Sequence, residues 1–129
     1  GICGGCQLLN VARGGSLVQH LEGHGGVRHR VSLAPGSRLS RILGGTRVET
    51  NSFHHQAVSA PGRGLEIVGE TADGTAEALE DPGHPFLLGV QWHPEKEYRK
   101  RPREARLFKA LISASFFRKS KSTKGLKRH

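Results

Sequence analysis

The chain has 129 residues, of which 35% are hydrophobic, and a formal net charge of +9, so it holds one domain at most, long enough to bury a core. No apolar run approaches the roughly 20 residues of a membrane span, and the N-terminus lacks a signal-peptide layout, so we expect no membrane partner. The only two cysteines have two residues between them, which excludes a disulfide framework and indicates a reducing, cytoplasmic location.

The positive charge is concentrated near the C-terminus. Residues 1–95 carry 7 Lys+Arg against 9 Asp+Glu, whereas residues 96–129 carry 13 against 2. A basic end can bind nucleic acid or an acidic membrane surface. The basic tail from residue 119 has no interleaved aromatic residues and no nucleic-acid motif, so we do not expect nucleic acid as a partner. We expect a solvated helix face and then a basic, disordered tail over residues 119–129.

The first seven residues have the pattern of a nucleophile elbow. Apolar Ile2 leads into Cys3, two glycines allow a turn too tight for side chains, and a helical pattern runs from Gln7 to Ala12. A helix that starts here brings unpaired N–H groups and its positive dipole end next to the sulfur, which favours thiolate over thiol. Cys3 is therefore the candidate nucleophile.

Short elements separated by glycine and proline follow the elbow. Apolar and polar residues alternate from Val27 to Leu33, which predicts a strand with one buried face. Ser37 is a suitable N-cap for a short helix that Gly44 and Gly45 would end. In chain order we expect a helix stop at 14–15, an extended piece at 16–21, a glycine-rich loop at 22–26, the strand at 27–33, the short helix, and a strand at 47–52.

The second half of the chain predicts a hairpin, a buried strand and a long helix. Asp73-Gly74 stands between two alternating runs, 65–70 and 75–80, which is a strong hairpin signal. The nearly continuous apolar run 86–92 is typical of a strand buried on both faces. Apolar residues at helical spacing predict a helix over about 103–117. Together these elements indicate an α/β domain.

A base and its orienting partner follow the buried strand. His93 comes just after the run 86–92, where an α/β sheet presents its functional residues. Glu95 lies two residues on, so its side chain points to the same side as that of His93 if the segment is extended. A carboxylate there can accept the imidazole N–H, select the tautomer and stabilise the imidazolium. Cys3, His93 and Glu95 therefore make a nucleophile, base and orienter.

Three motifs occur in a fixed order along the chain. They are Gly1-Ile2-Cys3-Gly4-Gly5-Cys6-Gln7-Leu8-Leu9-Asn10-Val11, Asn51-Ser52-Phe53-His54-His55-Gln56-Ala57-Val58 and Gly89-Val90-Gln91-Trp92-His93-Pro94-Glu95. The set resembles the class I glutamine amidotransferase-like family, within it the gamma-glutamyl-gamma-aminobutyrate hydrolase branch (peptidase family C26), up to about residue 117. The resemblance implies a flavodoxin-like, three-layer α/β amidotransferase fold, present as its C-terminal portion over residues 1–118.

The resemblance also implies an activity. The family attacks the side-chain amide of a small-molecule gamma-glutamyl substrate, releases an amine and hydrolyses the thioester, without a metal or an organic cofactor. Cys3 would be the nucleophile, His93 the base and Glu95 its partner, with the N–H of Gly4 as half of the oxyanion hole. Substrate-binding roles follow for three more residues, Gln7 at the glutamyl portion and Ser52 and His54 along the pocket.

The chain departs from the family pattern in two ways. The family usually has arginine where Gly4 stands and an unreactive residue, often methionine, where Cys6 stands. It also has roughly a further hundred residues before the elbow, in line with usual domain sizes, which carry sheet strands and the other oxyanion donor. We therefore expect the missing N-terminal half of the domain as a partner, with an oligomer as an open alternative. We expect the chain alone to be unstable and inactive.

Other interpretations of the same residues are weighed beside these. The spacing of Cys3 and Cys6 also fits a redox pair or half of a zinc site, but no second pair follows, so we expect Cys6 to pack in the core. Neighbouring His54 and His55 point to opposite faces of a strand, so one faces the pocket and the other packs or is solvated. We expect surface or loop positions without function for His20, His24, His29 and His84, and core packing for Trp92.

Two other functions fit the same motifs. One is a glutaminase subunit that passes ammonia to a synthetase partner, which would need a docking surface and a tunnel. The other is an inactive, truncated homologue that serves as a binding module. The intact Cys3, His93 and Glu95 argue against the inactive homologue, whereas the expected missing half argues for it.

Overall fold

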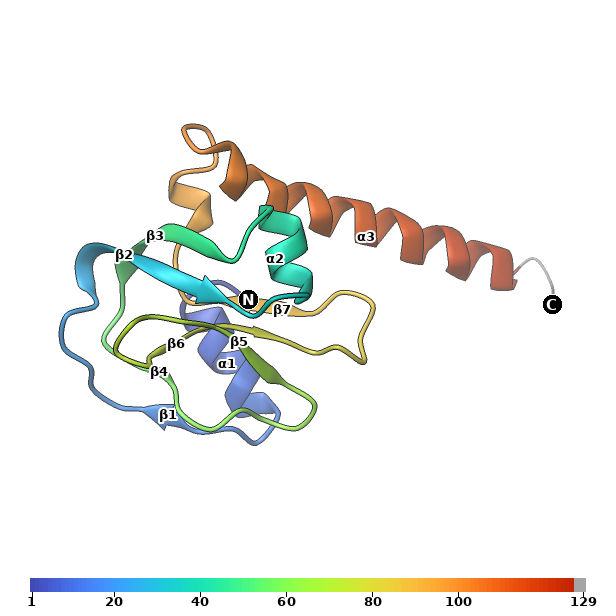
Figure 1. Ribbon diagram of the computed structural model, residues 1–129. Helices are drawn as coiled ribbons and strands as arrows, with labels where there is room; N and C mark the ends of the chain where they lie inside the picture. The colour runs from blue at the N-terminus through green and yellow to red at the C-terminus, as the bar shows by residue number, and fades with distance from the viewer. Residues whose placement is uncertain (127–129) are drawn as a thin grey trace.

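The computed structural model describes residues 1–126, and the side chains of residues 1–116, as a sheet with helices on both faces (Figure 1). The helices are α1 (Gly4–Ala12), α2 (Arg38–Leu43) and α3 (Pro102–Leu126), with a 3-10 turn, η1 (Pro94–Lys96). The strands are β1 (Leu17–Val18), β2 (Gly25–Leu33), β3 (Arg47–Phe53), β4 (Ala57–Val58), β5 (Glu66–Glu70), β6 (Ala76–Glu80) and β7 (Leu88–Val90).

Five strands form an antiparallel sheet in the order β3-β2-β5-β6-β7, and β1 pairs with β4 in a separate ribbon. The N-terminal segment lies beside β7 and runs parallel to it. Ile2 pairs with Val90, whose N–H donates to Gly1 O at 2.9 Å and whose carbonyl accepts from Cys3 N at 2.8 Å. The chain therefore leaves this segment and β7 at the same end of the sheet.

Two apolar clusters fill the opposite faces of the sheet. Neighbouring residues of the β5–β6 hairpin enter different clusters, Val68 and Ala78 on one face and Ile67 and Leu79 on the other, as the pleat of a strand requires. One cluster holds the apolar sides of α2 and α3, and the other holds the inner side of α1. The large members of the first are Leu39, Leu43, Trp92 and Leu107, and Cys6 and Leu9 join the second from α1. The three predicted layers are present.

The turn and capping signals of the sequence are confirmed. Ser37 caps α2, since its Oγ accepts a backbone N–H of the first turn at 3.1 Å, and Gly44 ends the helix at a φ of 77°. Between β5 and β6, Gly74 takes a φ of 82° and Asp73 Oδ1 accepts the N–H of Thr75 at 3.0 Å. The left-handed backbone at positions 44 and 74 explains why both residues are glycine.

Two elements differ slightly from their predicted lengths. α1 begins at Gly4 rather than Gln7, because the two glycines after the turn already belong to the helix. β7 covers only Leu88–Val90 of the apolar run 86–92, and Phe86, Leu87 and Leu88 are half-buried. The run therefore contains the predicted strand but is longer than it and is not buried throughout.

α3 is longer than the sequence predicted. It runs to Leu126 rather than ending near Phe117. Lysine is a good helix former, and the first glycine or proline after Pro102 is Gly125, so nothing in the sequence breaks the helix earlier. Most of the expected tail is therefore helical, and residues 127–129 lie outside the described part. In the part that is described, no helix has both the length and the apolar character to cross a membrane.

Candidate active site

Cys3 lies at the turn between the N-terminal strand segment and α1. Its φ of 50° and ψ of −106° form a backbone conformation that is unfavourable for a residue with a side chain, and no other described non-glycine residue has a positive φ. Backbone hydrogen bonds hold both sides of the turn, from Cys3 N to Val90 O and from Gly5 N to Ile2 O, each at 2.8 Å. This is the strand–turn–helix geometry that the sequence predicted.

Gly4 supplies a free backbone donor next to the thiol. The first N–H groups of a helix have no acceptor within the helix, and no described residue accepts from Gly4 N. A Cβ built on Gly4 would meet no heavy atom within 4 Å, so a larger side chain, such as the arginine of the family pattern, has room there. A donor in this position can stabilise negative charge that develops beside the sulfur.

His93 and Glu95 form a hydrogen-bonded pair directly after β7. His93 precedes η1, and the tight backbone of that turn brings Glu95 Oε1 against His93 Nδ1. When Nδ1 donates its proton to this carboxylate, Nε2 has the free lone pair that a base needs. The side chain of His93 is 23% exposed and that of Glu95 is 41% exposed, so a substrate can reach the pair.

Asn51 fixes the backbone of His93 from the neighbouring part of the fold. Asn51 lies on β3 and is buried, and its Oδ1 accepts the N–H of His93 at 2.9 Å. Its Nδ2 donates to His93 O at 3.0 Å. One side chain therefore holds both backbone polar groups of the candidate base. Sequence reasoning gave Asn51 no role, although it opens the second motif at the end of a predicted strand.

Cys3 and His93 lie at the same end of the sheet. Ile2 pairs with Val90 in parallel, and His93 follows that partner by three residues. Within the described residues the thiol and the imidazole form no hydrogen bond with each other. Gln91 instead donates from Nε2 to Cys3 Sγ at 3.6 Å. Catalytic hydrogen bonds are often long or absent before a substrate binds, so the lack of a direct hydrogen bond between Cys3 and His93 is compatible with their roles as nucleophile and base.

Gln7 lies one helical turn after Cys3, as predicted, but its amide nitrogen is bound within the protein. Its Nε2 donates to Gln56 O at 2.9 Å and to Gln91 Oε1 at 3.2 Å. Gln7 therefore orients the Gln91 amide that faces the thiol. Only the amide oxygen of Gln7 is left to meet a substrate.

Ser52 and His54 are interior residues, which corrects their expected places along an open pocket. Ser52 is fully buried and its Oγ donates to His24 O at 2.6 Å. His54 is 6% exposed, with Nδ1 2.8 Å from Gln56 O and Nε2 3.1 Å from Glu77 Oε1. Both are covered because the segment around His24 lies over the end of β3, where His54 N also donates to His24 O at 3.1 Å.

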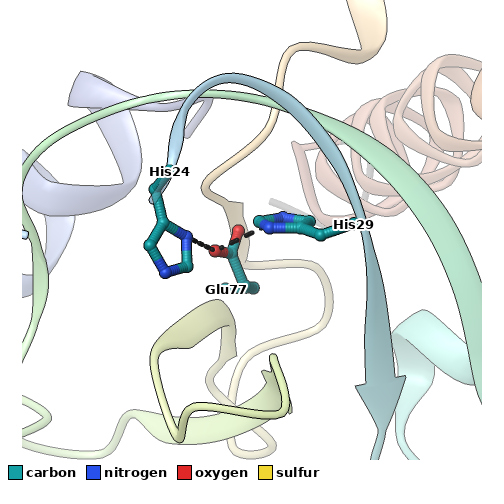
Figure 2. Close-up of side chains that lie close together, drawn as sticks. All are labelled: His24, His29 and Glu77. Carbon is teal, nitrogen blue, oxygen red and sulfur yellow. Dashed lines mark ion pairs between the residues drawn. The ribbon is translucent and has the colours of Figure 1, made fainter. Parts of the chain in front are cut away.

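A buried carboxylate, that of Glu77 on β6, lies among three histidines. Figure 2 shows His24 and His29 on either side of it. The distances to Glu77 Oε1 are 3.1 Å from His54 Nε2, 3.4 Å from His24 Nδ1 and 3.6 Å from His29 Nε2. His24 lies in the loop before β2, as the expectation of a surface or loop position allowed, but it is buried, with 3% of its surface exposed. Sequence reasoning missed the cluster because its members come from distant parts of the chain.

The cluster shifts the protonation of its members. Burial by itself would raise the pKa of the Glu77 carboxyl, but the His29 and His54 rings together outweigh burial and lower it. Burial would likewise lower the pKa of His54, yet its contacts with Glu77 and with Gln56 O raise it. The carboxylate is therefore held in its charged form inside the protein.

Cys6 and Trp92 pack in the interior, as predicted. Cys6 is 1% exposed, and burial raises the pKa of its thiol to about 12, so it stays protonated. Cys3 and Cys6 are both free thiols. Trp92 is fully buried and donates from Nε1 to Glu104 Oε2 at 3.0 Å.

Comparisons with known proteins give relatives for this chain. The family model of peptidase C26 matches residues 1–95. A putative glutamine amidotransferase of Mycobacterium tuberculosis is 44% identical in an alignment that covers 89% of this chain and 39% of that protein. A gamma-glutamyl-gamma-aminobutyrate hydrolase of Escherichia coli is 33% identical in an alignment that covers 88% of this chain and 52% of that protein. The chain thus spans two fifths to half of the length of these two relatives.

Solved structures share the fold. A putative GMP synthase subunit from Thermoplasma acidophilum superposes with a TM-score of 0.75 at 21% identity, over 95% of this chain and 59% of that chain. A glutamine amidotransferase from Thermotoga maritima gives a TM-score of 0.64 at 20% identity, over 89% of this chain and 48% of that chain. The predicted α/β fold of the class I glutamine amidotransferases, present in part, is confirmed.

Proposed function

Since this chain belongs to the peptidase C26 family of glutamine amidotransferase-like proteins, we propose that it is a cysteine hydrolase that cleaves gamma-glutamyl amide bonds. We further propose a substrate of the gamma-glutamyl-aminobutyrate type, which the relative from Escherichia coli supports by its name. The relative from Mycobacterium tuberculosis, named a putative glutamine amidotransferase, favours glutamine as the alternative. Both substrates carry the same glutamyl group and differ in the leaving amine. A reducing, cytoplasmic location would keep the nucleophile as a free thiol.

One observation carries the proposal. A cysteine in a strained turn at the start of a helix lies at the same sheet end as a histidine that is already paired with a carboxylate. Cys3 and the His93–Glu95 pair come from distant parts of the sequence, and the parallel pairing of Ile2 with Val90 supports the proposal because the segments of both then end at the same edge of the sheet. Backbone strain persists only where the surroundings enforce it, and strained residues often lie at functional sites. The strained backbone of Cys3 therefore supports a functional role for this residue.

In the first half of the proposed reaction, His93 Nε2 accepts the proton of Cys3. The sulfur then attacks the gamma carbonyl carbon, and the carbonyl oxygen takes up the electron pair of the C=O π bond. Gly4 N–H donates to this oxyanion. When the tetrahedral intermediate collapses, the C–N bond breaks, the amine leaves with the proton from His93, and a glutamyl thioester remains on Cys3.

In the second half, water hydrolyses the thioester. His93 takes a proton from water, the resulting hydroxide attacks the thioester carbon, and the C–S bond breaks to release glutamate. The proton on His93 returns to the sulfur. Glu95 stabilises the imidazolium in both halves and does not itself need to become protonated.

The remaining polar residues act by positioning in this proposal. Asn51 holds the backbone of His93 through two hydrogen bonds. Gln91 donates to the thiol and is itself oriented by Gln7, whose free amide oxygen can meet the glutamyl amine. His54 Nδ1 and Gln7 Nε2 both contact Gln56 O, so buried His54 supports the segment that holds Gln7. Ser52, also buried, donates to His24 O.

The test uses two substrates and one reactive probe. Because the chain alone is expected to be inactive and spans 52% of the Escherichia coli relative, it is assayed joined to the remaining part of that relative. This fusion is incubated with gamma-glutamyl-aminobutyrate, with glutamine, and with a gamma-glutamyl chloromethyl ketone, which alkylates a thiolate held next to a glutamyl site. We expect hydrolysis of gamma-glutamyl-aminobutyrate to exceed that of glutamine, and the probe to attach to Cys3. Cys3→Ala should lower kcat at least about 10³-fold, as loss of a catalytic nucleophile does.

Cys6→Ala is the matched control, because Cys6 lies on the same helix but is buried and protonated. It should leave both turnover and probe attachment at Cys3 unchanged. Faster hydrolysis of glutamine than of gamma-glutamyl-aminobutyrate would transfer the proposal to the glutaminase alternative. Unchanged probe attachment and turnover in Cys3→Ala would overturn the assignment of the nucleophile.

A further inference from the structure

The cluster around Glu77 has the composition of a metal site. His24 Nδ1, His29 Nε2 and a carboxylate oxygen of Glu77 all lie within 4.8 Å of one another (Figure 2). Glu77 is fully buried, His24 is 3% exposed, and the side chain of His29 is 16% exposed. Imidazole nitrogen and carboxylate oxygen are common ligands of zinc and its neighbours among the divalent transition metals.

Within the described part of the chain, the two histidine nitrogens that face Glu77 lack hydrogen bonds, whereas Glu77 Oε1, which they face, already accepts from His54 Nε2 at 3.1 Å. Among the described residues, His24 Nδ1, His29 Nε2 and Glu77 Oε2 are buried atoms without a hydrogen-bond partner. Buried polar atoms are nearly always paired, so three orphaned atoms at one place require an explanation. The contacts of the two histidines with Glu77 Oε1, at 3.4 and 3.6 Å, are ion-pair distances rather than hydrogen bonds.

The second nitrogen of His24 shows why its first nitrogen is orphaned. His24 Nε2 lies 2.7 Å from Asp73 Oδ2, an arrangement in which the ring donates its proton to that carboxylate. A neutral ring with its proton on Nε2 has only a lone pair on Nδ1. That lone pair then faces the carboxylate oxygen of Glu77, and two acceptors cannot satisfy each other. A cation between them satisfies both.

The spacing of these atoms fits a coordinated ion. Ligands at the metal–ligand distances of zinc, about 2.0–2.1 Å, lie about 3.3 Å apart around a tetrahedral centre. The distances from Glu77 Oε1 to His24 Nδ1 and His29 Nε2, 3.4 and 3.6 Å, are close to that value. The third separation, between the two histidine nitrogens, is within 4.8 Å, so the rings would move towards each other to bind an ion.

The surroundings supply the outer partners that metal sites use. A histidine that binds a metal generally donates its other N–H to a carboxylate, as His24 does to Asp73. Thr71 Oγ1 and Thr75 N in turn donate to Asp73 Oδ1, at 2.5 and 3.0 Å. The carboxylate of Glu77 is likewise held by His54 Nε2 at 3.1 Å.

We propose that His24 Nδ1, His29 Nε2 and Glu77 bind a divalent first-row transition-metal ion of the zinc class. The ion joins the segment before β2, β2 itself and β6, and it fixes His54, which supports the Gln56 segment behind the proposed pocket. Its role is structural, and no step of the proposed hydrolysis passes through it. Another cation could fill the same gap, namely a proton that makes one of the histidines an imidazolium. The experiment separates the two.

The experiment uses the 129-residue chain in a Cys3→Ala background, so that the free thiol cannot act as the zinc ligand. After removal of metal with a chelator, Zn²⁺ is titrated by calorimetry, and Co²⁺ is titrated by visible absorption, which reports N and O coordination. We expect one ion per chain and a rise in Tm with Zn²⁺, because an ion that binds the folded chain stabilises it. Circular dichroism of the metal-free protein checks the fold of each variant.

Two variants and one control locate the site. His29→Asn and Glu77→Gln each remove one ligand and should weaken Zn²⁺ binding at least about 10-fold. If Glu77→Gln fails to fold, His29→Asn decides, since its side chain is partly exposed. His20→Asn is the matched control, a histidine with a side chain that is 70% exposed, and it should bind Zn²⁺ as the background does.

Three results would overturn the proposal. They are no Zn²⁺ binding in the Cys3→Ala background, equal binding in His29→Asn, and an equal loss in His20→Asn. No binding would assign a proton to the gap. Because the Cys3→Ala background lacks the proposed nucleophile, none of these binding results depends on whether the chain hydrolyses gamma-glutamyl amides.

Discussion

At the scale of single residues, the two cysteines show how surroundings separate identical side chains. Cys3 is half-buried, at a helix start with a free N–H beside it, whereas Cys6 faces the sheet one turn later and is 1% exposed. Burial in apolar surroundings opposes ionisation, and it raises the pKa of the Cys6 thiol to about 12. Ionisation of Cys6 at neutral pH is therefore disfavoured.

We predict that alkylation distinguishes the two thiols. Iodoacetamide at neutral pH should modify Cys3 alone in the folded chain and both cysteines after denaturation, as peptide mass mapping will show. The raised pKa also has a linkage consequence. The contribution of protonated Cys6 to stability is complete below its ordinary pKa and is lost as the pH rises towards about 12. Alkylation of Cys6 by iodoacetamide in the folded chain at neutral pH would contradict the prediction that only Cys3 is modified.

At the scale of elements, buried polar side chains join parts of the chain that no strand pairing connects. Asn51 connects β3 to the segment after β7, and Glu104 connects α3 to Trp92 in the same segment. Asn51 holds the backbone of His93 itself, on which the proposed reaction depends, and Glu104 holds Trp92, the residue before it. The position of the base is thus set by side-chain hydrogen bonds more than by the sheet.

We predict that Asn51→Ala lowers turnover through the position of His93. Both hydrogen bonds to the His93 backbone would be lost, so kcat should fall about 10- to 100-fold, because small displacements of a base cost that much. KM should change far less, since Asn51 is buried and does not reach a substrate. The split between kcat and KM in steady-state assays measures this. An increase in KM with kcat unchanged would assign Asn51 to binding instead.

We predict that Glu104 stabilises the chain as an acceptor rather than as a charge. Burial raises the pKa of its carboxyl despite the hydrogen bond from Trp92. The contribution of protonated Glu104 is therefore complete below the ordinary glutamate pKa of about 4.3 and is lost as the pH rises through the folded-state value. Glu104→Gln keeps an acceptor for Trp92 Nε1 and should become the more stable protein relative to wild type as pH rises.

Glu104→Ala provides the contrast. It leaves the buried Trp92 N–H without an acceptor, so urea unfolding should show a loss of about 1–3 kcal/mol. A loss of the same size in Glu104→Gln at neutral pH would mean that the charge, not the acceptor, stabilises the chain.

We predict that Gly89 is required where α1 crosses β7. A Cβ on Gly89 would lie 2.8 Å from Cys6 Sγ and 3.3 Å from Cys6 Cβ. Gly89→Ala should therefore destabilise the chain by about 1–3 kcal/mol through overpacking. Cys6→Ala in the same chain removes the sulfur and should restore part of the loss in a double-mutant cycle. Gly5→Ala, where a Cβ meets nothing within 4 Å, is the control and should not destabilise the chain.

At the scale of the whole molecule, one sheet lies between two apolar clusters and contributes residues to both. Residues of the β5–β6 hairpin enter both apolar clusters, so neither cluster can lose its packing while the hairpin stays intact. The described residues therefore form one structural unit, although the chain matches only 39% and 52% of the two relatives described above.

We predict one cooperative unfolding transition. Trp92 is the single tryptophan and lies fully buried in the cluster below α2 and α3, so its fluorescence reports on that face. Far-UV circular dichroism reports on helices of both faces. The midpoints from the two probes should coincide in urea, as in a two-state protein. Separate midpoints would show that the two cores unfold independently.

The sequence predicted the local elements well, because their signals lie within a few residues. Ser37 and Gly44 mark the ends of α2, and Asp73-Gly74 marks the hairpin turn. The elbow at Cys3 was predicted for the same reason, since glycine and a helix start are local features. The end of α3 was not, because no residue near Phe117 marks it.

For the candidate site, the sequence alone predicted which residues would carry the proposed chemistry, namely Cys3, His93 and Glu95, through residue type and spacing. It could not determine which side chains are open to a substrate, and Ser52 and His54 proved to be interior residues. It also gave no sign of the site proposed at Glu77, whose three members lie on separate elements. Burial and long-range contact depend on which segments cover one another, and that is decided only when the sheet brings distant parts of the chain together.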